Sequence, residues 1–379
     1  MMAGHVRHLY VHLPFCSHRC GYCDFVTLVD RHASHGAYVD ALLRELELEG
    51  SVLADPLATV FLGGGTPTLT ESRELARLLA AMPQADEVTV EANPETVSPE
   101  LVGVLRTGGV TRVSVGAQSF TPRLLDVLER RATPADVRRA VHTLRDANFD
   151  NISLDLIYGI PGQSTADLEL DLAEALALEP EHLSLYELEA KPGTRFTHSW
   201  AEELAQQADL METYLERCVQ LLRGAGYRWY ETASFCRMAT DAGERDLRAQ
   251  HNLAYWQGRD YVGLGIGAVS TVGGIRWRNR PSLGRYLGAL VRGAAPPRDE
   301  ERIGERTRRW ERAMLGLRLD EPLAAARLAG LLEPGALGRL GELGLLEQIP
   351  HGGNEPAVRL TQRGRLLGDA VTAELLVAP

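Results

Sequence analysis

Residues 8–25 read His-Leu-Tyr-Val-His-Leu-Pro-Phe-Cys-Ser-His-Arg-Cys-Gly-Tyr-Cys-Asp-Phe, an apolar run followed at once by three closely spaced cysteines. The run His8–Leu13 predicts a strand. Cys16, Cys20 and Cys23 stand with three and two residues between them, in a loop directly after that strand. Such a loop can give thiolates to three irons of one cubane and leave the fourth iron open for another ligand.

A structural zinc site, completed by His12 or His18, is the alternative interpretation of these cysteines. Structural zinc sites usually pair two Cys-x-x-Cys elements, so the spacing favours an iron–sulfur cluster. Gly21 then marks a point where the backbone approaches the cluster closely or takes a positive φ.

The rest of the first two thirds of the chain alternates between short apolar runs and stretches with helical periodicity. The runs predict strands at 8–13, 59–62, 87–91, 112–115, 152–157 and 182–188. Helices are predicted at 38–49, 72–81, 99–107, 134–148 and 166–178, followed by a helix at 202–225 and an edge strand at 229–231. This order indicates parallel strands with crossover helices, closing at least partly into a barrel with functional groups at the strands' C-terminal ends.

The C-terminal part of the chain has a different pattern. Gly263–Gly267 is turn-rich, and Ala294–Pro297 is typical of a linker. Helices are then predicted at 306–318, 323–332 and 334–343, before a strand at 357–361 and a last helix at 363–376, an order typical of a winged helix. We therefore predict three parts, residues 1–235, 236–300 and 301–379.

Composition narrows the function classes. The 379 residues carry 51 acidic and 40 basic side chains, a formal charge of −11, which argues against nucleic acid as a partner. No run approaches the roughly 18 apolar residues of a membrane-spanning helix, and the N-terminus lacks the pattern of a signal peptide. We therefore expect a cytoplasmic protein, where the odd number of five cysteines fits a ligand cluster better than disulfides.

The three-cysteine loop resembles the signature of the radical SAM superfamily. Further sequence motifs narrow the resemblance to the HemN/HemW group of coproporphyrinogen-oxidase-like proteins. These motifs lie at residues 10–16, 22–25, 63–68, 91–94, 115–120 and 155–162. The resemblance implies an α/β fold, a partial (β/α)6 radical SAM barrel with a smaller C-terminal α+β winged-helix-like domain. It also implies a [4Fe-4S] cluster on Cys16, Cys20 and Cys23, whose open iron is chelated by S-adenosylmethionine (SAM).

In the resembling group, one set of residues would contact SAM: Tyr10, Gly64, Gly65, Thr66 and Glu91. A second set, Gln118, Arg130 and Asp155, would line a second SAM site or a substrate-side pocket. Some chemistry supports this independently, since a glycine loop after a strand exposes backbone to a ligand, and Asp155 in an apolar strand needs a partner or a role. These residues also have purely structural interpretations. The glycines could form only a tight turn, and Arg130 could form a charge pair on a helix surface with its neighbour Arg131.

Two features indicate the branch of heme chaperones over the oxidases. The oxidases carry a further cysteine two residues after the third, where this chain has Phe25. Residues 250–261 contain His251-Asn-Leu-Ala-Tyr-Trp, which resembles the HNxxYW element whose histidine is a proposed heme ligand. The alternative is a histidine satisfied within the fold. Gln250 and Val269 depart from the expected Cys-Arg-His-Asn and Gly-Ala-His-Ser, which puts heme ligation in question.

The resulting hypothesis is a heme chaperone that binds heme as cargo and passes it to an acceptor protein, as a monomer or homodimer. An oxygen-independent coproporphyrinogen III oxidase and a radical SAM methyltransferase are the alternatives, and no catalytic residue is assigned. Two cysteines lie outside the cluster motif: Cys218 is expected to be a buried small hydrophobe, and Cys236 a soft ligand. The last helix either packs on its own core or makes a peripheral membrane contact.

Overall fold

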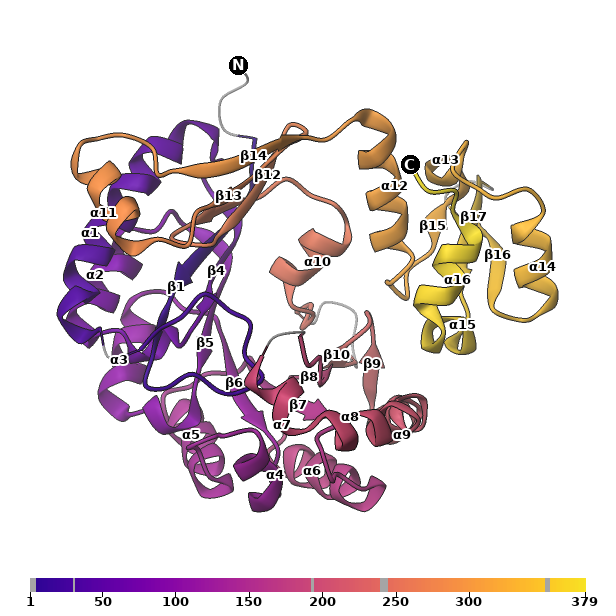
Figure 1. Cartoon of the computed structure of the whole chain (residues 1–379), viewed down its shortest axis with the longest axis horizontal. Coiled ribbons are helices and arrows are strands. Elements are labelled where there is room, and N and C mark those ends of the chain that lie inside the picture. Colours follow the sequence, from indigo (N-terminus) through magenta and orange to yellow (C-terminus); the bar gives the residue numbers. More distant parts are fainter. Residues whose placement is uncertain (1–4, 30, 192–193, 239–244, 352–354) are drawn as a thin grey trace. The chain divides into compact units, whose positions relative to one another are not determined.

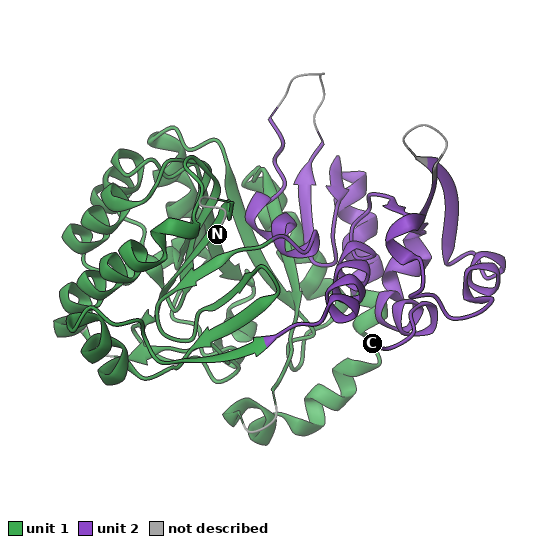
Figure 2. Ribbon diagram, turned by 90° about the horizontal axis from the view of Figure 1, so that it is seen from above, with its two compact units in different colours: residues 1–214, 260–301 green, residues 215–259, 302–379 purple. Residues whose placement is uncertain are grey.

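The computed structural model describes residues 5–29, 31–191, 194–238, 245–351 and 355–379. The chain divides into two compact units (Figure 2). The first unit comprises residues 1–214 and 260–301, and the second comprises residues 215–259 and 302–379. Each unit therefore uses two stretches of chain, whereas the predicted parts 1–235, 236–300 and 301–379 are continuous; those three ranges stay a prediction.

The first unit is built on parallel strands in the order β11-β1-β4-β5-β6-β7-β8. Their bounds are β1 His8–Leu13, β4 Leu57–Gly64, β5 Ala85–Ala92, β6 Arg112–Gln118, β7 Ile152–Tyr158, β8 His182–Glu187 and β11 Val262–Leu264. All six predicted strands are present. Because every neighbouring pair is parallel, their C-terminal ends lie along one edge, where the predicted site residues converge.

Crossover helices lie on the outer side of these strands (Figure 1). They are α1 His35–Glu49, α2 Ser72–Ala81, α3 Pro99–Thr107, α4 Pro122–Val127, α5 Pro134–Asp146 and α6 Thr165–Ala177. The starts of three helices follow from sequence: Ser98 caps α3, and capping boxes begin α5 at Thr133 and α6 at Ser164. Such caps satisfy N–H groups that a helix start leaves without an intrahelical acceptor.

The predicted single helix at 202–225 is wrong. The chain forms α7 Arg195–Ser199, α8 Ala201–Ala208 and α9 Met211–Gly224, with a break at residues 209–210. Gln207 explains the break, because its buried amide donates to the carbonyl oxygen of Gln163, 3.1 Å away. The hydroxyl of Tyr214 donates to the same carbonyl oxygen at 2.7 Å, so both helices are anchored on one loop.

The glycine-rich segment near residue 263 contains a strand that the sequence pattern did not predict. In this segment, β11 pairs in parallel with β1, with Val262 opposite Leu9 and Leu264 opposite Val11. The chain continues into a sheet of β12 Val269–Val272, β13 Ile275–Asn279 and β14 Arg298–Arg302, with α11 Leu283–Val291 between the last two strands.

A buried carboxyl group ties this returning segment to α1. Glu45 accepts hydrogen bonds from Gly265 N at 2.8 Å, Asn279 Nδ2 at 2.7 Å and the Tyr286 hydroxyl at 2.6 Å. Burial raises the pKa of Glu45 to about 7. A buried carboxyl group needs such partners, because an unpaired one in the interior is costly.

The second unit contains the hairpin β9 Tyr227–Trp229 and β10 Ser234–Arg237, helix α10 Gln250–Trp256, and a C-terminal α+β part. That part runs α12 Glu305–Gly316, β15 Leu323–Ala324, α13 Ala325–Leu328, α14 Ala336–Glu342, β16 Leu346–His351, β17 Glu355–Leu360, α15 Gln362–Leu366 and α16 Gly368–Leu375. The predicted helix at 323–332 is thus a short strand and one helical turn, and the predicted last helix is interrupted at Leu367.

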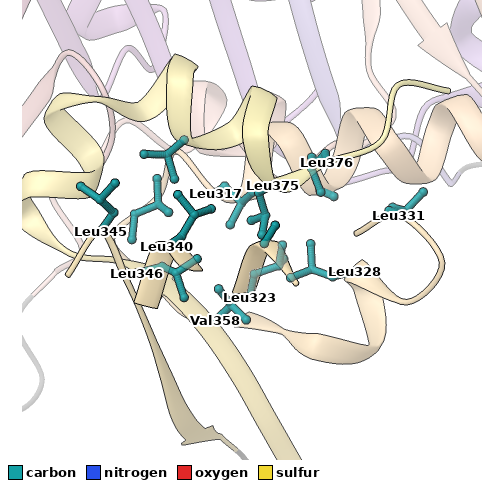
Figure 3. Packing of buried hydrophobic residues seen from close by; sticks show 14 residues of the cluster. Leu317, Leu323, Leu328, Leu331, Leu340, Leu345, Leu346, Val358, Leu375 and Leu376 are labelled. Atoms are coloured by element: carbon teal, nitrogen blue, oxygen red, sulfur yellow. The ribbon is translucent and has the colours of Figure 1, made fainter. Parts of the chain in front are cut away.

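The C-terminal part has its own leucine-rich core (Figure 3). Leu328, Leu340 and Leu375 are almost completely buried in it. Val371 and Leu376 in the last helical segment are buried in the same core, so the apolar face of that segment is used for packing. No helix in the described part of the chain is long and apolar enough to cross a membrane.

Candidate cluster and cofactor site

The cysteine loop leaves β1 and is closed at its base by a short pair of strands. These strands are β2 Phe15–Cys16 and β3 Leu28–Val29, which pair in parallel. Cys16, Cys20 and Cys23 line one cavity of about 480 Å³, together with the carboxyl ends of the barrel strands. Small-ligand pockets typically have volumes of roughly 300–1,000 Å³, so the cavity has room for more than a single metal ion.

The chemistry of the three thiols fits a bound cluster. Burial raises the pKa of the Cys16 thiol to about 11 and also raises the pKa values of Cys20 and Cys23. Thiols placed together in this way need a positive metal centre in order to lose their protons. Arg130 lies within hydrogen-bonding reach of Cys20 and supplies a positive charge beside the loop.

Of the two histidines of the zinc alternative, His12 is engaged elsewhere, whereas His18 lies beside the cysteines. His12 makes hydrogen bonds through both ring nitrogens, with the Tyr10 hydroxyl at 3.0 Å and the Val26 carbonyl oxygen at 2.8 Å. His18 Nε2 lies 2.6 Å from the Glu129 carbonyl oxygen and 3.5 Å from Cys20 Sγ, and His18 lines the same cavity as the cysteines. Among the residues that the structure describes, no three His, Cys, Asp or Glu side chains are grouped tightly enough to hold one metal ion, the three cysteines included, so this observation does not separate zinc from a cluster.

The glycine loop after β4 is packed against the root of the cysteine loop. Gly64 has a φ of +116°, and a Cβ there would lie 2.6 Å from the His12 ring. A Cβ on Gly65 would lie 2.7 Å from the backbone of Pro14. Close packing therefore requires both glycines, in addition to any contact with a ligand.

Hydrogen bonds within the protein already use the N–H groups of this loop. Gly64 N donates to Glu91 Oε2 at 3.1 Å, Gly65 N to the Leu13 carbonyl at 2.8 Å, and Thr66 N to the Phe15 carbonyl at 2.8 Å. A bound ligand would therefore meet carbonyl oxygens and the Thr66 hydroxyl here. Carbonyl oxygens are the acceptors that an amino group requires.

Two half-buried carboxyl groups, Glu91 at the end of β5 and Asp155 in β7, line the cavity. Burial raises the pKa of Glu91 to about 7, and the nearby charge of Asp155 acts in the same direction. Burial also raises the pKa of Asp155, whose two oxygens accept from the Ser114 hydroxyl at 3.1 and 2.9 Å. Paired carboxyl groups with perturbed pKa values in a cavity are typical of functional sites.

Arg130 is part of the cavity, in contrast to the alternative of a surface charge pair. Its Nη2 donates to Asn93 Oδ1 and to the Gly116 carbonyl oxygen, both at 3.0 Å. Gln118 ends β6 with a left-handed φ of +65° and also lines the cavity.

Sequence reasoning missed Asn93 and Ser114 as site residues. Asn93 joins Arg130 to the Thr66 hydroxyl, and Ser114 holds Asp155. The available signal was their position, since Asn93 follows Glu91 by two residues at a strand end and Ser114 lies on the same strand as Gln118.

Tyr10 and Gly21 are not among the residues that line the cavity. The hydroxyl of Tyr10 contacts His12, and its ring stacks on Phe61 at 6.1 Å. A positive φ, one of the two reasons expected for Gly21, is not found, and a Cβ there would lie 2.9 Å from Glu129 Oε1; close approach of its backbone to the cluster stays a prediction. Gly21 makes room for a glutamate outside the cavity.

His251 lies in the second unit and is closed from solvent. It is 1% exposed, in α10, and its Nε2 lies 2.9 Å from the Tyr255 hydroxyl. The two rings meet edge to face at 4.8 Å. The two cysteines outside the motif are also buried: Cys218 in α9 and Cys236 in β10, the latter packed with Tyr230, Leu253 and Leu319.

Comparisons with known proteins cover both units. A model of the radical SAM superfamily matches residues 10–175. The heme chaperone HemW of Mycobacterium tuberculosis (strain ATCC 25618 / H37Rv) is 37% identical over 388 residues, which cover 99% of this chain and 96% of that protein. HemW of Bacillus subtilis (strain 168) is 33% identical and covers 97% of this chain and 98% of its own length.

A solved structure supports the fold. Coproporphyrinogen III oxidase (HemN) from Escherichia coli, described as a radical SAM enzyme, superposes with a TM-score of 0.80, covering 98% of this chain and 90% of that chain. Its sequence is 22% identical, so the likeness concerns the fold alone. The predicted partial barrel with a smaller C-terminal domain is confirmed.

Proposed function

The chain belongs to the HemW family of heme chaperones within the radical SAM superfamily, and we propose that it binds heme and delivers it to an acceptor protein. A [4Fe-4S] cluster on Cys16, Cys20 and Cys23 and a bound SAM molecule would occupy the cavity of the first unit. The observation that carries the proposal is the likeness over the whole chain, which includes the second unit with its His251 element.

The cavity supports binding of the cluster and SAM. Three thiols from one loop face the ends of β4, β5, β6 and β7, which contribute the glycine loop, Glu91, Gln118 and Asp155. When bound, the cluster would offer an open iron to the amino and carboxylate groups of SAM. The chain's own residues would hold the ligand: carbonyl oxygens of the glycine loop would accept from its amino group, and Glu91 would accept from its ribose hydroxyls.

His251 is the residue that we propose as heme ligand. Imidazole is an ordinary axial ligand of heme iron, and Tyr255 and Trp256 supply aromatic surface nearby. Because the His251 ring is buried and its Nε2 is engaged with the Tyr255 hydroxyl, heme binding requires that Tyr255 release the ring. Because Gln250 and Val269 replace the arginine and histidine of the expected motifs, His251 would then ligate heme without those two groups.

An enzyme is the second candidate, either an oxidase that decarboxylates coproporphyrinogen III or a methyltransferase. The observation that favours it is the pair Glu91 and Asp155, whose raised pKa values suit proton transfer in the same cavity. Phe25 argues for the chaperone, since it is 64% exposed at the cavity where the oxidases carry a further cysteine.

An anaerobic heme titration tests the proposal. Protein with a reconstituted cluster is titrated with heme and followed by absorbance, alongside His251→Ala, and 5′-deoxyadenosine is assayed in the same samples. We expect saturable binding that the substitution weakens, with little deoxyadenosine. Deoxyadenosine that forms rapidly on addition of coproporphyrinogen, without specific heme binding, would contradict the chaperone and support the enzyme.

The proposal also covers the acceptor protein, the oligomeric state and the cellular compartment. We expect this chain to act in the cytoplasm as a monomer or homodimer that passes heme to an acceptor protein, without nucleic acid. A peripheral membrane contact would have to use a surface other than the apolar face of α16, because Val371 and Leu375 are buried in the core. Vesicle co-sedimentation of the heme-loaded protein tests that contact.

A further inference from the structure

Glu129 is an unusual residue beside the cysteine loop. It follows α4 with a left-handed φ of +54°, a conformation that residues other than glycine adopt only at an energetic cost. It does not line the cavity, although the next residue, Arg130, does. Strain of this kind persists where surrounding contacts require the conformation, so the contacts of Glu129 are informative.

The backbone and side chain of Glu129 both contact the middle of the cysteine loop. Its carbonyl oxygen accepts from His18 Nε2 at 2.6 Å, and the Cys20 thiol lies 3.9 Å from the same oxygen. Its carboxylate covers Gly21, where a Cβ would lie 2.9 Å from Oε1. The left-handed backbone thus presents the carbonyl and the carboxylate to one short segment of the loop.

Arg195 completes the arrangement from α7, 66 positions later in the chain. Its Nη2 lies 2.7 Å from Glu129 Oε2 and 3.4 Å from the Arg19 carbonyl oxygen. The side chains of Glu129 and Arg195 are 41% and 71% exposed, so the pair sits at the rim and not in the cofactor cavity. An α-helix far along the sequence is therefore tied to the loop through two exposed charges.

We propose that Glu129 and Arg195 form a clamp that holds the cysteine loop closed over its cluster and sets how long the cluster is retained. Movement of residues 18–21 away from the cavity would expose the cluster's ligands, and the clamp would resist this movement. Outer residues that orient metal ligands commonly affect metal affinity in this way. The inference rests on the proposed cluster, but not on heme delivery. Both residues are positioning residues that act through the loop.

Cluster retention is measured directly. Reconstituted protein is mixed anaerobically with an excess of a strong iron chelator, and the rate of iron loss is recorded for Glu129→Ala, Arg195→Ala and the double variant. Exposed pairs contribute up to about 1 kcal/mol, which corresponds to iron loss about two- to fivefold faster. The double variant should lose iron no faster than Arg195→Ala, because that substitution already removes the contacts of Arg195 with Glu129 and with the Arg19 carbonyl oxygen.

Gly21→Ala tests the clamp without changing any charge. The added Cβ would lie 2.9 Å from Glu129 Oε1 and 3.5 Å from Oε2, so the carboxylate must shift and its contact with Arg195 is weakened. We expect iron loss faster than in the wild type but no faster than in Glu129→Ala, and no further increase when both substitutions are combined. Gly21 does not line the cavity, so the new methyl group does not occupy cofactor space.

Glu179→Ala is the matched control. Glu179 is an exposed glutamate with a left-handed φ of +51°, and it lies far from the loop at the end of α6. Its substitution should lower the thermal midpoint about as much as Glu129→Ala does, while iron loss stays at the wild-type rate. A purely structural role for Glu129 would move the midpoint and leave iron loss unchanged.

Three outcomes would overturn the inference: wild-type iron loss in both single variants, additive effects in the double variant, or equal acceleration in Glu179→Ala. The proposed function fails differently. If wild-type protein takes up no cluster at all, iron and sulfide analysis shows this before any variant is compared, and the cluster assignment itself is then wrong. A failed heme titration with normal cluster retention leaves the clamp in place.

Discussion

The cysteine loop of the first unit and helix α10 of the second unit carry the two parts of the proposed function, and they differ in how the fold presents them. The three cysteines line a cavity with residues from the ends of five barrel strands, β4 to β8. His251 is 1% exposed and hydrogen-bonded within its own helix. One site is open to a ligand as the chain folds, while the other must rearrange before a ligand can reach it.

The difference shows which kind of motif predicts a site. Strand-end motifs in register are brought together by the parallel sheet, so that Glu91 and Asp155 meet although 64 residues separate them. A single histidine in a short helix has no such constraint. Its neighbours decide whether it is a ligand or a core residue, and these cannot be read from the motif alone.

The largest expected effect separates cysteines within the loop from those outside it. Cys20→Ala should abolish cluster uptake, because a cubane loses one of its three protein ligands. Cys236→Ala should leave cluster uptake unchanged, since Cys236 is packed among Tyr230 and Leu253 in the second unit. Iron and sulfide per chain after reconstitution measure both. Loss of the cluster in Cys236→Ala would break the distinction between the two regions.

A smaller effect is expected at the strand ends. Glu91→Gln removes a carboxylate that would accept ribose hydroxyls, and charge-assisted hydrogen bonds of about 1.5–3 kcal/mol predict SAM binding weaker by about 10- to 100-fold. Glu87→Gln, at the start of the same strand, is the control and should bind SAM normally. Equilibrium dialysis with labelled SAM gives both constants. Equal weakening in the two variants would remove Glu91 from the site.

The pH dependence of SAM binding follows from the same carboxyl group. Burial raises the pKa of Glu91 to about 7, so in the ligand-free protein Glu91 is protonated below this pH and cannot accept hydrogen bonds as a carboxylate. We expect SAM affinity to fall about tenfold between pH 8 and pH 6, with Asp155 acting in the same direction. The decline should be smaller in Glu91→Gln, and an equally steep decline there would assign it to another group.

The smallest expected effect concerns α10. If Tyr255 must release His251 for heme to bind, Tyr255→Phe removes one hydrogen bond of about 1 kcal/mol and raises heme affinity about fivefold. His251→Ala should act in the opposite direction. If His251 has only a structural role, both substitutions lower the thermal midpoint and neither changes heme affinity. Parallel heme titrations and thermal melts distinguish these results.

The sequence predicted the barrel well where local signals and burial agree. The bounds of β1, α2 and α3 match their predicted ranges, because apolar runs are flanked by proline, serine or a cysteine loop. The break at 209–210 was missed, since it depends on Gln207 bonding to Gln163, a contact between distant residues. β11 was missed because three residues among glycines form a strand only when β1 is present as a partner.

The candidate site was also predictable where local sequence motifs mark it, and not where it depends on contacts between distant residues. Ten of the predicted residues line one cavity: Cys16, Cys20, Cys23, Gly64, Gly65, Thr66, Glu91, Gln118, Arg130 and Asp155. Glu129 could not be found, because a glutamate after a helix is an ordinary surface residue in sequence. Only its left-handed φ and its contacts with the loop distinguish it.

The pairing of β11 with β1 has a consequence for how this protein is made. Leu9 and Val11 are fully buried beside β11, which the ribosome supplies only after the first stretch of the second unit has been synthesised. Until then the nascent chain carries an unpaired apolar edge, the kind of surface that promotes aggregation. The cysteine loop is attached to that same strand, β1. A cluster can therefore be loaded onto a completed barrel only after β11 has been synthesised.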